Sequence, residues 1–399
     1  MARNRLALTV GALGVTVIAV TAVIGWWVVR DDDSSKRTAA KPSSSAPRNS
    51  NAPAPATTSQ SCDAAAVIAS WPLEQRMAQL LMVGVDSRSG DEANELVGRY
   101  GVGGIFIGGE ATGIFRDGSL ARLSSPAAVP ALVAVDEEGG RVQRIDRLAG
   151  PIPSARVMGQ TMTSAQVHDI GLERGRALRN VGVTMDLAPV VDVSNQGSGQ
   201  VIGDRSFSND AGVVSEYAGA FASGLREAGV IPVLKHFPGH GHATGDSHRQ
   251  AAVTPPLGDL QAVDLVPYRR LLTEPQFGVM IGHLDVPGLT APGEPASISP
   301  GAVNDFLRTQ LGYRGFVITD DLSEMEAIRR SYGVPEAARR ALAAGGDMAL
   351  FVDSAQLPDV LRHLVDAVGS NRLDETQVNQ SVLRVLAVKA FDPCRQAPK

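Results

Sequence analysis

The sequence predicts a single (β/α)8 barrel of the TIM type, preceded by a transmembrane helix and a disordered linker. Between Trp71 and Leu386, eight short apolar runs alternate with longer amphipathic stretches. The runs are almost continuously hydrophobic, as in parallel strands that are covered on both faces. Ionisable residues follow the ends of five successive runs, which is where a barrel of this kind assembles its site.

The first element is a hydrophobic N-terminal segment. Residues 6–29 carry no charge, and as a helix they would span about 36 Å, enough to cross a hydrocarbon core of about 30 Å. Arg3 and Arg5 precede the segment and Asp31 follows it, so the positive-inside bias places residues 1–5 in the cytoplasm. We therefore expect a single-pass signal anchor in the cell membrane with the rest of the chain outside. A cleaved signal is the alternative and would secrete the same domain.

The second element is a linker. Residues 30–61 are rich in Ser, Ala, Pro and Thr and contain almost no large apolar side chains, so we expect a disordered tether. Residues 62–399 then form the folded domain, with the only two cysteines, Cys62 and Cys394, near its ends. In an oxidising compartment a disulfide between them would stabilise the domain by about 5 kcal/mol in the chain-entropy account, and two free thiols are the alternative.

The barrel elements follow in order. The predicted strands are 80–85, 103–107, 131–136, 184–189, 232–236, 278–283, 316–320 and 347–352. Ser299 and Pro300 indicate a helix start, Leu311-Gly312 its end, and Ser323 followed by Glu326 matches a capping box. A doubly wound open sheet is the alternative, but no Gly-x-Gly-x-x-Gly follows the first strand.

Ionisable residues follow the third to seventh predicted strands. A barrel without an active site would not need so many ionisable residues at these points. They are Asp136 and Arg144, then Asp192 and Arg205, then residues 235–248, then His283 and Asp285, and finally Asp320 and Asp321. Each alone is compatible with a satisfied polar group or a solvated loop charge. Their recurrence favours one shared site.

The densest signal is the loop at residues 235–248, which contains four of the seven histidines. Histidine can both accept and donate a proton near neutral pH, and Asp246, two residues before His248, can fix its tautomer. A metal site at His240-x-His242 is an alternative, although no third ligand lies nearby in sequence. A second alternative to the dyad is a flexible surface loop in which the histidines have no function.

This loop reads Lys-His-Phe-Pro-Gly-His-Gly-x4-Asp-Ser-His and resembles the signature of glycoside hydrolase family 3 β-N-acetylglucosaminidases of the peptidoglycan-turnover type. Residues 136–144 (Asp-Glu-Glu-Gly-Gly-Arg-Val-Gln-Arg), 201–207 (Val-Ile-Gly-Asp-Arg-Ser-Phe) and 316–322 (Phe-Val-Ile-Thr-Asp-Asp-Leu) are similar as well. The resemblance covers about residues 70 to 390, and the loop motif is its most specific part.

The resemblance implies a role for each matching residue. Asp320 would be the nucleophile and His248 the acid/base, with Asp246 completing its dyad. The terminal sugar would be held by Asp136, Arg144, Arg205, Lys235 and His236. Because successive strand residues face opposite ways, only one of Asp320 and Asp321 should point into the site, and the family motif selects Asp320. Pairing of Arg205 with Asp204, and of Lys235 with a barrel carboxylate, are the structural alternatives.

These roles imply a retaining exo-β-N-acetylglucosaminidase (EC 3.2.1.52 type) that forms a covalent glycosyl-Asp320 intermediate. The N-terminal segment, absent from cytoplasmic members of the family, points to peptidoglycan fragments or other β-GlcNAc glycans outside the membrane. The alternatives are a β-glucosidase or β-xylosidase, a GlcNAc phosphorylase, a metal-dependent hydrolase and an inactive binding protein.

The composition and net charge of the chain limit which kinds of partner it can bind. The chain has 399 residues, of which 44% are hydrophobic and 20% charged, so disorder is excluded as its main state. The formal net charge is −5 and there is no long basic run, so no nucleic-acid partner is expected. We expect a monomer that needs no metal or organic cofactor.

Overall fold

The computed structural model describes residues 62–110, 112–123, 129–273 and 276–395. The predicted cytoplasmic end, transmembrane helix and tether lie outside these residues. Within the described ranges, no helix is both long enough and apolar enough to cross a membrane.

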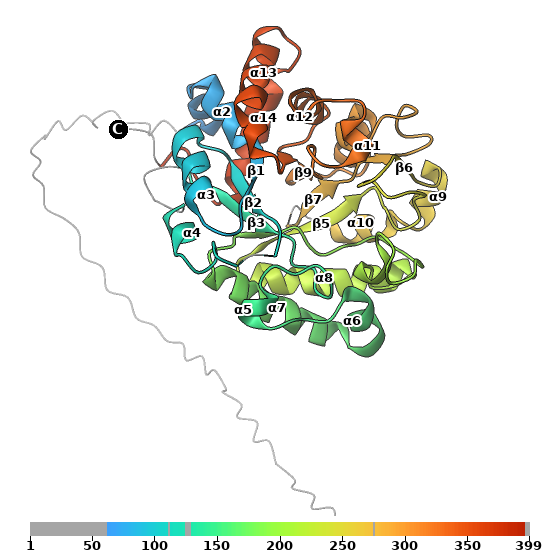
Figure 1. The fold of residues 1–399 in the computed structure, drawn as a ribbon. Helices are drawn as coiled ribbons and strands as arrows, with labels where there is room; N and C mark the ends of the chain where they lie inside the picture. Colours follow the sequence, from blue (N-terminus) through green and yellow to red (C-terminus); the bar gives the residue numbers. More distant parts are fainter. Residues whose placement is uncertain (1–61, 111, 124–128, 274–275, 396–399) are drawn as a thin grey trace, which may run out of the picture. The chain divides into compact units, whose positions relative to one another are not determined.

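Eight parallel strands form a nearly closed barrel, and each lies within or close to one of the predicted ranges. The sheet order is β10-β1-β2-β3-β4-β5-β7-β9, and the amide of Thr319 donates to the carbonyl of Met348 at 3.1 Å, where the two edge strands meet. Figure 1 shows the strands surrounded by helices. The strands are β1 (Leu81–Val85), β2 (Gly104–Ile107), β3 (Leu132–Val135), β4 (Met185–Asp186), β5 (Ile231–Phe237), β7 (Gly278–Ile281), β9 (Val317–Thr319) and β10 (Ala349–Phe351).

Helices cover the outside of the barrel. The longer ones are α7 (Ser164–Asn180), α8 (Ala211–Glu227), η4 (Gly301–Gln310, π-helical), α12 (Val334–Ala343), α13 (Leu357–Gly369) and α14 (Glu375–Val388). The shorter segments are α1 (Ala64–Ala69), α2 (Leu73–Gln79), α3 (Asp91–Glu95), η1 (Leu96–Tyr100), α4 (Ser119–Arg122), α5 (Asp146–Ala149), α6 (Ala155–Thr161), η2 (Gly203–Arg205), α9 (Leu257–Ala262), α10 (Val266–Leu271), η3 (Ala296–Ile298), α11 (Glu326–Arg329) and η5 (Ser354–Gln356).

Helices α7 and α8 pack unusually close together. A Cβ atom at Gly171 would lie 2.4 Å from the carbonyl oxygen of Phe221, and one at Gly224 would lie 2.2 Å from that of His168. Only glycine permits this approach. Thr163 and Gln166 form a reciprocal capping box at the start of α7, and Asp210 caps α8 through the amide of Val213.

Two predicted helix starts are wrong in detail. Helix α11 begins at Glu326 with Met325 as its uncapped N-cap, because the Ser323 hydroxyl instead accepts the amide of Val352 at 2.9 Å. Helix η4 has Pro300 at its N-cap, and Ser299 makes no side-chain cap. A small parallel pair, β6 (Ala252–Val253) and β8 (Leu284–Asp285), was not predicted, since two residues are too few to carry a period.

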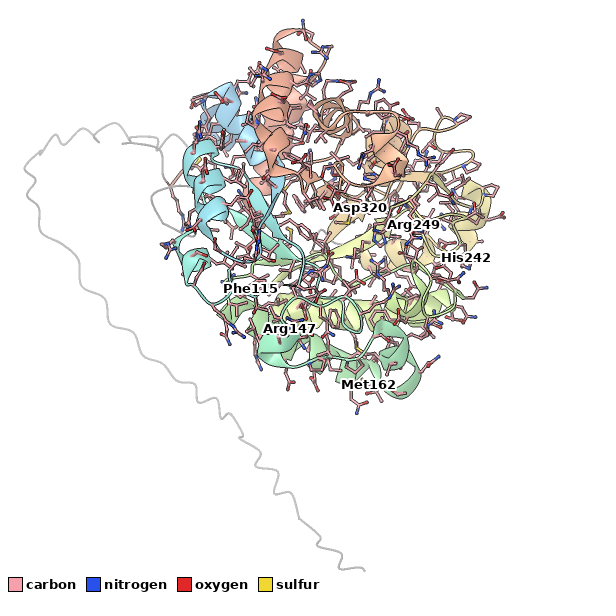
Figure 2. All side chains as sticks on the ribbon, in the orientation of Figure 1. Phe115, Arg147, Met162, His242, Arg249 and Asp320 are labelled. Atoms are coloured by element: carbon pink, nitrogen blue, oxygen red, sulfur yellow. A yellow bond between two sulfur atoms is a disulfide. The ribbon has the colours of Figure 1, made fainter. Side chains whose placement is uncertain are left out.

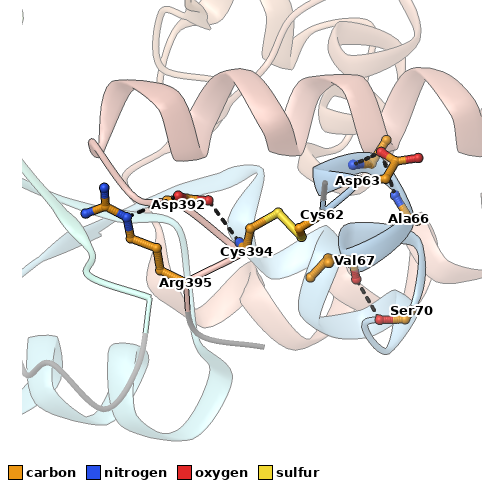
Figure 3. Close-up of a disulfide and its surroundings, with 9 residues drawn as sticks. Cys62, Asp63, Ala66, Val67, Ser70, Asp392, Cys394 and Arg395 are labelled. Carbon is orange, nitrogen blue, oxygen red and sulfur yellow. Dashed lines mark hydrogen bonds and ion pairs between the residues drawn. A yellow bond between two sulfur atoms is a disulfide. The ribbon is translucent and has the colours of Figure 1, made fainter. Parts of the chain in front are cut away.

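The ends of the folded domain are joined. Cys62 and Cys394 form a disulfide with their Cα atoms 5.8 Å apart. Figure 3 shows this bond beside Asp63, which caps α1 through the amide of Ala65, and Asp392, which accepts the amide of Cys394.

Candidate active site

The carboxyl ends of the strands surround a cavity of about 960 Å³. All eight of the predicted catalytic and sugar-binding residues line it, and Figure 2 shows Asp320 near the centre of the ring of strands. They are Asp136, Arg144, Arg205, Lys235, His236, Asp246, His248 and Asp320.

The loop after β3 is fixed by a buried acid, Glu137. Its carboxylate accepts the amides of Arg144 at 2.5 Å and Ile145 at 3.1 Å, and it lies 3.2 Å from Arg174. Burial raises the pKa of Glu137, and these donors oppose the rise. The effect is to hold Arg144 at the cavity, 3.8 Å from Asp136.

A second buried acid, Glu138, organises the sugar-binding cluster. It receives a two-pronged contact from Arg205 at 2.7 and 2.8 Å and an ion pair from Lys235 at 2.6 Å. Lys235 also contacts Asp136 at 2.6 Å. Burial would raise the pKa of Glu138, but the charges of Arg205 and Lys235 outweigh burial and hold it well below its usual range.

The two ion pairs considered as structural alternatives, Arg205 with Asp204 and Lys235 with a barrel carboxylate, therefore have different outcomes. Asp204 pairs with Arg141 at 2.8 Å, so its suggested pairing with Arg205 is wrong. Lys235 does pair with barrel carboxylates, but it does so at the cavity. Sequence reasoning missed Glu138, although its place beside Asp136 in a motif already singled out was a usable signal.

His236 is oriented by Asp192, which is fully buried. One Asp192 oxygen lies 2.8 Å from Nδ1 of His236, and the other accepts the backbone amide of His240 at 2.7 Å. Burial would raise the pKa of Asp192, but its interactions with His236 and His240 lower it. Asp192 thus ties the end of β5 to the loop that follows.

That loop presents the predicted dyad. Nδ1 of His248 lies 2.8 Å from the Asp246 carboxylate, and the His248 amide donates to the same oxygen at 3.1 Å. Partial burial would raise the pKa of Asp246, but the hydrogen bonds from His248 lower it. The carboxylate is therefore ionised near neutral pH and fixes which ring nitrogen of His248 faces away from it.

Glycines and a second histidine set the course of the loop. Gly239 has φ +134°, and a Cβ atom at Gly241 would lie 2.0 Å from the carbonyl oxygen of Val193. His240 is buried, with Nε2 3.1 Å from the hydroxyl of Ser247. Because Ser247 lies between Asp246 and His248, this contact fixes the dyad.

The suggested metal ligands do not converge. His240 contacts Ser247, whereas Nδ1 of His242 lies 2.9 Å from Asp264. No group of three or more His, Cys, Asp or Glu side chains among the described residues is arranged to hold a metal ion.

Asp320 directly follows β9. One of its oxygens accepts the amide of Asp321 at 2.9 Å. Withdrawal from water would raise the pKa of Asp320, but its electrostatic interactions with His236 and His283 and the hydrogen bond from the Asp321 amide lower it. Asp320 is therefore an ionised carboxylate at neutral pH.

Asp321 has a different task. Its two oxygens accept the amides of Ser323 at 3.0 Å, Glu324 at 2.9 Å and Val352 at 3.0 Å. These bonds join the turn after β9 to the end of β10, so Asp321 is structural although it borders the cavity.

His283 is also structural. It is buried, its Nε2 donates to the carbonyl of Asp321 at 2.7 Å, and Nδ1 lies 2.7 Å from the hydroxyl of Ser297. Burial lowers the pKa of His283, and it is not among the residues that line the cavity.

Known proteins are similar to this chain in sequence and in fold. Residues 72–388 match the family described as glycosyl hydrolase family 3 N terminal domain. Beta-hexosaminidase LpqI of Mycobacterium tuberculosis is 50% identical over 325 residues, covering 80% of this chain and 83% of LpqI. A beta-hexosaminidase of Nitrosomonas eutropha is 36% identical over 275 residues, covering 66% of this chain and 77% of that protein.

Solved structures of similar proteins have the same fold as this chain. The structure of M. tuberculosis LpqI superposes with a TM-score of 0.79 at 48% identity, covering 84% of this chain and 98% of the solved chain. A family 3 β-N-acetylglucosaminidase from Paenibacillus has a TM-score of 0.74 at 31% identity, covering 82% of this chain and 64% of its own. The chain belongs to glycosyl hydrolase family 3 and is a glycoside hydrolase of the β-N-acetylhexosaminidase type.

Proposed function

We propose that the protein is a retaining exo-β-N-acetylglucosaminidase that removes terminal β-linked GlcNAc from peptidoglycan fragments outside the membrane. One observation carries the proposal. An ionised carboxylate, Asp320, and a histidine–carboxylate dyad, His248 with Asp246, line the same cavity as a cluster suited to sugar hydroxyls.

The reaction has two halves. The Asp320 carboxylate attacks the anomeric carbon while the bond to the leaving oxygen breaks, and that oxygen takes the proton carried by Nε2 of His248. Water then attacks the anomeric carbon, gives a proton to His248, and Asp320 departs as a carboxylate. Two inversions give net retention.

The surrounding residues bind the non-reducing sugar. Asp136 is partly accessible and can accept hydrogen bonds from two hydroxyls, while Arg144 presents several donors. Lys235 and Arg205 already share Glu138, so they are preorganised and lose little entropy when a sugar binds.

Two features support a site of action outside the membrane. Residues 6–29 have the length and flanking charges of a signal anchor. The Cys62–Cys394 disulfide is typical of an oxidising compartment.

Purified full-length protein in mild detergent tests the activity. We expect release of nitrophenol from the β-GlcNAc glycoside and at least about tenfold less from the β-glucose glycoside. The rate should be unaffected by chelator. Loss of cleavage with chelator would contradict the proposal, and a GlcNAc-1-phosphate product in phosphate buffer would indicate a phosphorylase.

Asp320→Asn tests the covalent step. The amide is a poor nucleophile, so we expect turnover to fall by at least about 10³-fold with little change in melting temperature. The measurement is kcat for the nitrophenyl β-GlcNAc glycoside, with Asp321→Asn as the neighbouring comparison. An Asp320→Asn variant with more than about a tenth of wild-type activity would rule out the covalent role.

A further inference from the structure

A second hollow shares no lining residue with the catalytic cavity. Its volume of about 300 Å³ lies at the lower end of the range for small-molecule sites. It lies between α6, which Figure 1 shows at the outer edge of the molecule, and the loop after β4. The two pack closely, since a Cβ atom at Gly159 would lie 2.4 Å from the carbonyl oxygen of Phe207. The polar residues that line the hollow are Arg156, Gln160, Asn195, Ser208 and Asn209.

Arg156 brings to this hollow a positive charge that no acid neutralises. Its Nε donates to the carbonyl of Ser206 at 3.0 Å, and its Nη2 donates to the carbonyls of Ser194 at 2.8 Å and Gly203 at 3.0 Å. Among the described residues, no carboxylate pairs with Arg156, and its Nη1 has no hydrogen-bond partner and is not buried. None of the lining residues is acidic. The guanidinium is therefore fixed in advance and keeps a free donor for an oxyanion.

Three amide side chains surround this charge. Gln160, Asn195 and Asn209 are exposed, and within the described ranges their side chains make no hydrogen bond. Each amide offers both a donor and an acceptor. The Ser208 hydroxyl accepts the amide of Asp210 at 3.1 Å and keeps its own proton to donate. The hollow thus combines one cation with several groups that can both donate and accept.

This combination discriminates between classes of ligand. A phosphate group presents mainly acceptors and would leave the amide oxygens of the hollow without donors. A neutral sugar would match the amides but would not use the charge of Arg156. The end of a peptide matches both features, because its carboxylate is an anion and each preceding peptide unit has one N–H and one C=O.

We propose that this hollow binds the carboxyl end of a short peptide, with the terminal carboxylate on Arg156 and the adjacent peptide units on Asn195 and Asn209. A guanidinium and a carboxylate form a strong, charge-assisted contact. Peptidoglycan fragments carry such peptides, so the inference is compatible with the proposed substrate. It goes beyond the proposed function and does not depend on it, since the hollow and the catalytic cavity have no lining residue in common.

Two dipeptides test the inference by calorimetric titration of the full-length protein in mild detergent. Acetyl-Ala-Ala and its C-terminal amide have the same shape and differ in one charge, and each is used as the L,L and the D,D form. The better enantiomer of the acid should bind about tenfold more tightly than its amide, because hydrogen bonds to charged groups contribute about 1.5–3 kcal/mol. Salt at about 0.5 M should reduce this preference.

Asn209→Asp locates the binding at this hollow. The variant keeps the shape of the side chain and places a negative charge beside Arg156, so we expect at least about tenfold weaker binding of the acid. Its melting temperature and its rate on the nitrophenyl β-GlcNAc glycoside should stay at wild-type values. Asn180→Asp is the matched control, because Asn180 is an exposed asparagine at the end of α7, and it should keep wild-type affinity. Arg156→Lys should bind the acid with intermediate affinity.

Three results would overturn the inference. The first is that neither enantiomer of the acid binds up to about 10 mM, or that the acid and the amide bind equally. The second is undiminished binding of the acid by Asn209→Asp, which would place the peptide elsewhere, as in the catalytic cavity. The third is inorganic phosphate binding at least as tightly as the acid and being weakened by Asn209→Asp, which would indicate a general anion site. Loss of glycosidase activity in the wild type would reject the proposed function and leave these binding results unaffected.

Discussion

At the scale of single residues, the surroundings of each buried or partly buried carboxylate decide whether its pKa is lowered or raised. Asp320 and Asp246 have lowered pKa values because of neighbouring histidines and amides, in spite of burial. Asp186 is also fully buried, but there burial raises the pKa well above the usual range, and one oxygen of Asp186 has no hydrogen-bond partner among the described residues. Position relative to donors, and not residue type, decides which carboxylates are ionised.

His248→Ala should discriminate between leaving groups. Without its proton donor, the enzyme should lose at least about 100-fold in kcat/KM on chitobiose, whose alkoxide leaves poorly. The nitrophenyl glycoside should lose far less, because nitrophenolate leaves without protonation. The measurement is the ratio of the two rates in wild type and variant. Equal losses on both substrates would exclude acid catalysis by His248.

Glu138→Gln should destabilise the fold in a pH-dependent way. The folded pKa of Glu138 is lowered, so its stabilising effect is present above the unfolded value of about 4.3 and is lost as pH falls through the folded value. We expect a loss of about 3–5 kcal/mol at neutral pH, because Lys235 and Arg205 keep their buried charges.

Denaturant unfolding at pH 7 and at about pH 3.5 measures this difference, which should shrink in acid. Asp204→Asn provides the control, since its ion pair with Arg141 is partly exposed and should contribute no more than about 1 kcal/mol. A loss in Glu138→Gln that does not vary with pH would argue against an ionised Glu138.

At the scale of elements, the loop after β5 is held at both ends. The Ser247 hydroxyl contacts the buried His240 ring. The Ser247 carbonyl accepts a 3.1 Å hydrogen bond from the amide of Ala327, at the start of α11. At the other end, His242 pairs with Asp264. The dyad therefore lies on a segment braced by two neighbouring parts of the barrel.

Ser247→Ala should loosen the dyad without unfolding the protein. Loss of one buried hydrogen bond corresponds to about 1 kcal/mol, so we expect kcat on chitobiose to fall about five- to tenfold and the nitrophenyl rate to change less. Thr244→Val is the control on the same loop, because its hydroxyl bonds the Val253 carbonyl and not His240. A Ser247→Ala enzyme with wild-type rates on chitobiose would show that the bracing is unimportant.

At the scale of the whole molecule, the Cys62–Cys394 disulfide closes a loop with a sequence separation of 332 residues. Neither cysteine lines the cavity. The bond thus stabilises the fold by restricting the unfolded chain and leaves the chemistry untouched.

Reduction should therefore lower stability and spare activity. We expect a loss of about 2–5 kcal/mol in unfolding free energy on treatment with reductant, with unchanged kcat at temperatures well below the melting point. The Cys62→Ser/Cys394→Ser double variant is the control, since reductant should have no further effect on it. An identical melting temperature with and without reductant in the wild type would contradict the role.

The sequence by itself determined the eight strands and eight of the residues that line the cavity. Buried parallel strands need continuous apolar runs, and the residues after them share one end of the barrel. Which charged side chains pair with one another was decided only by the closure of the barrel in three dimensions. Glu138 meets Arg205 across 67 residues, and Asp192 meets His236 across 44. Such contacts depend on how strands far apart in sequence are placed in space, and no local pattern of residue types records that placement.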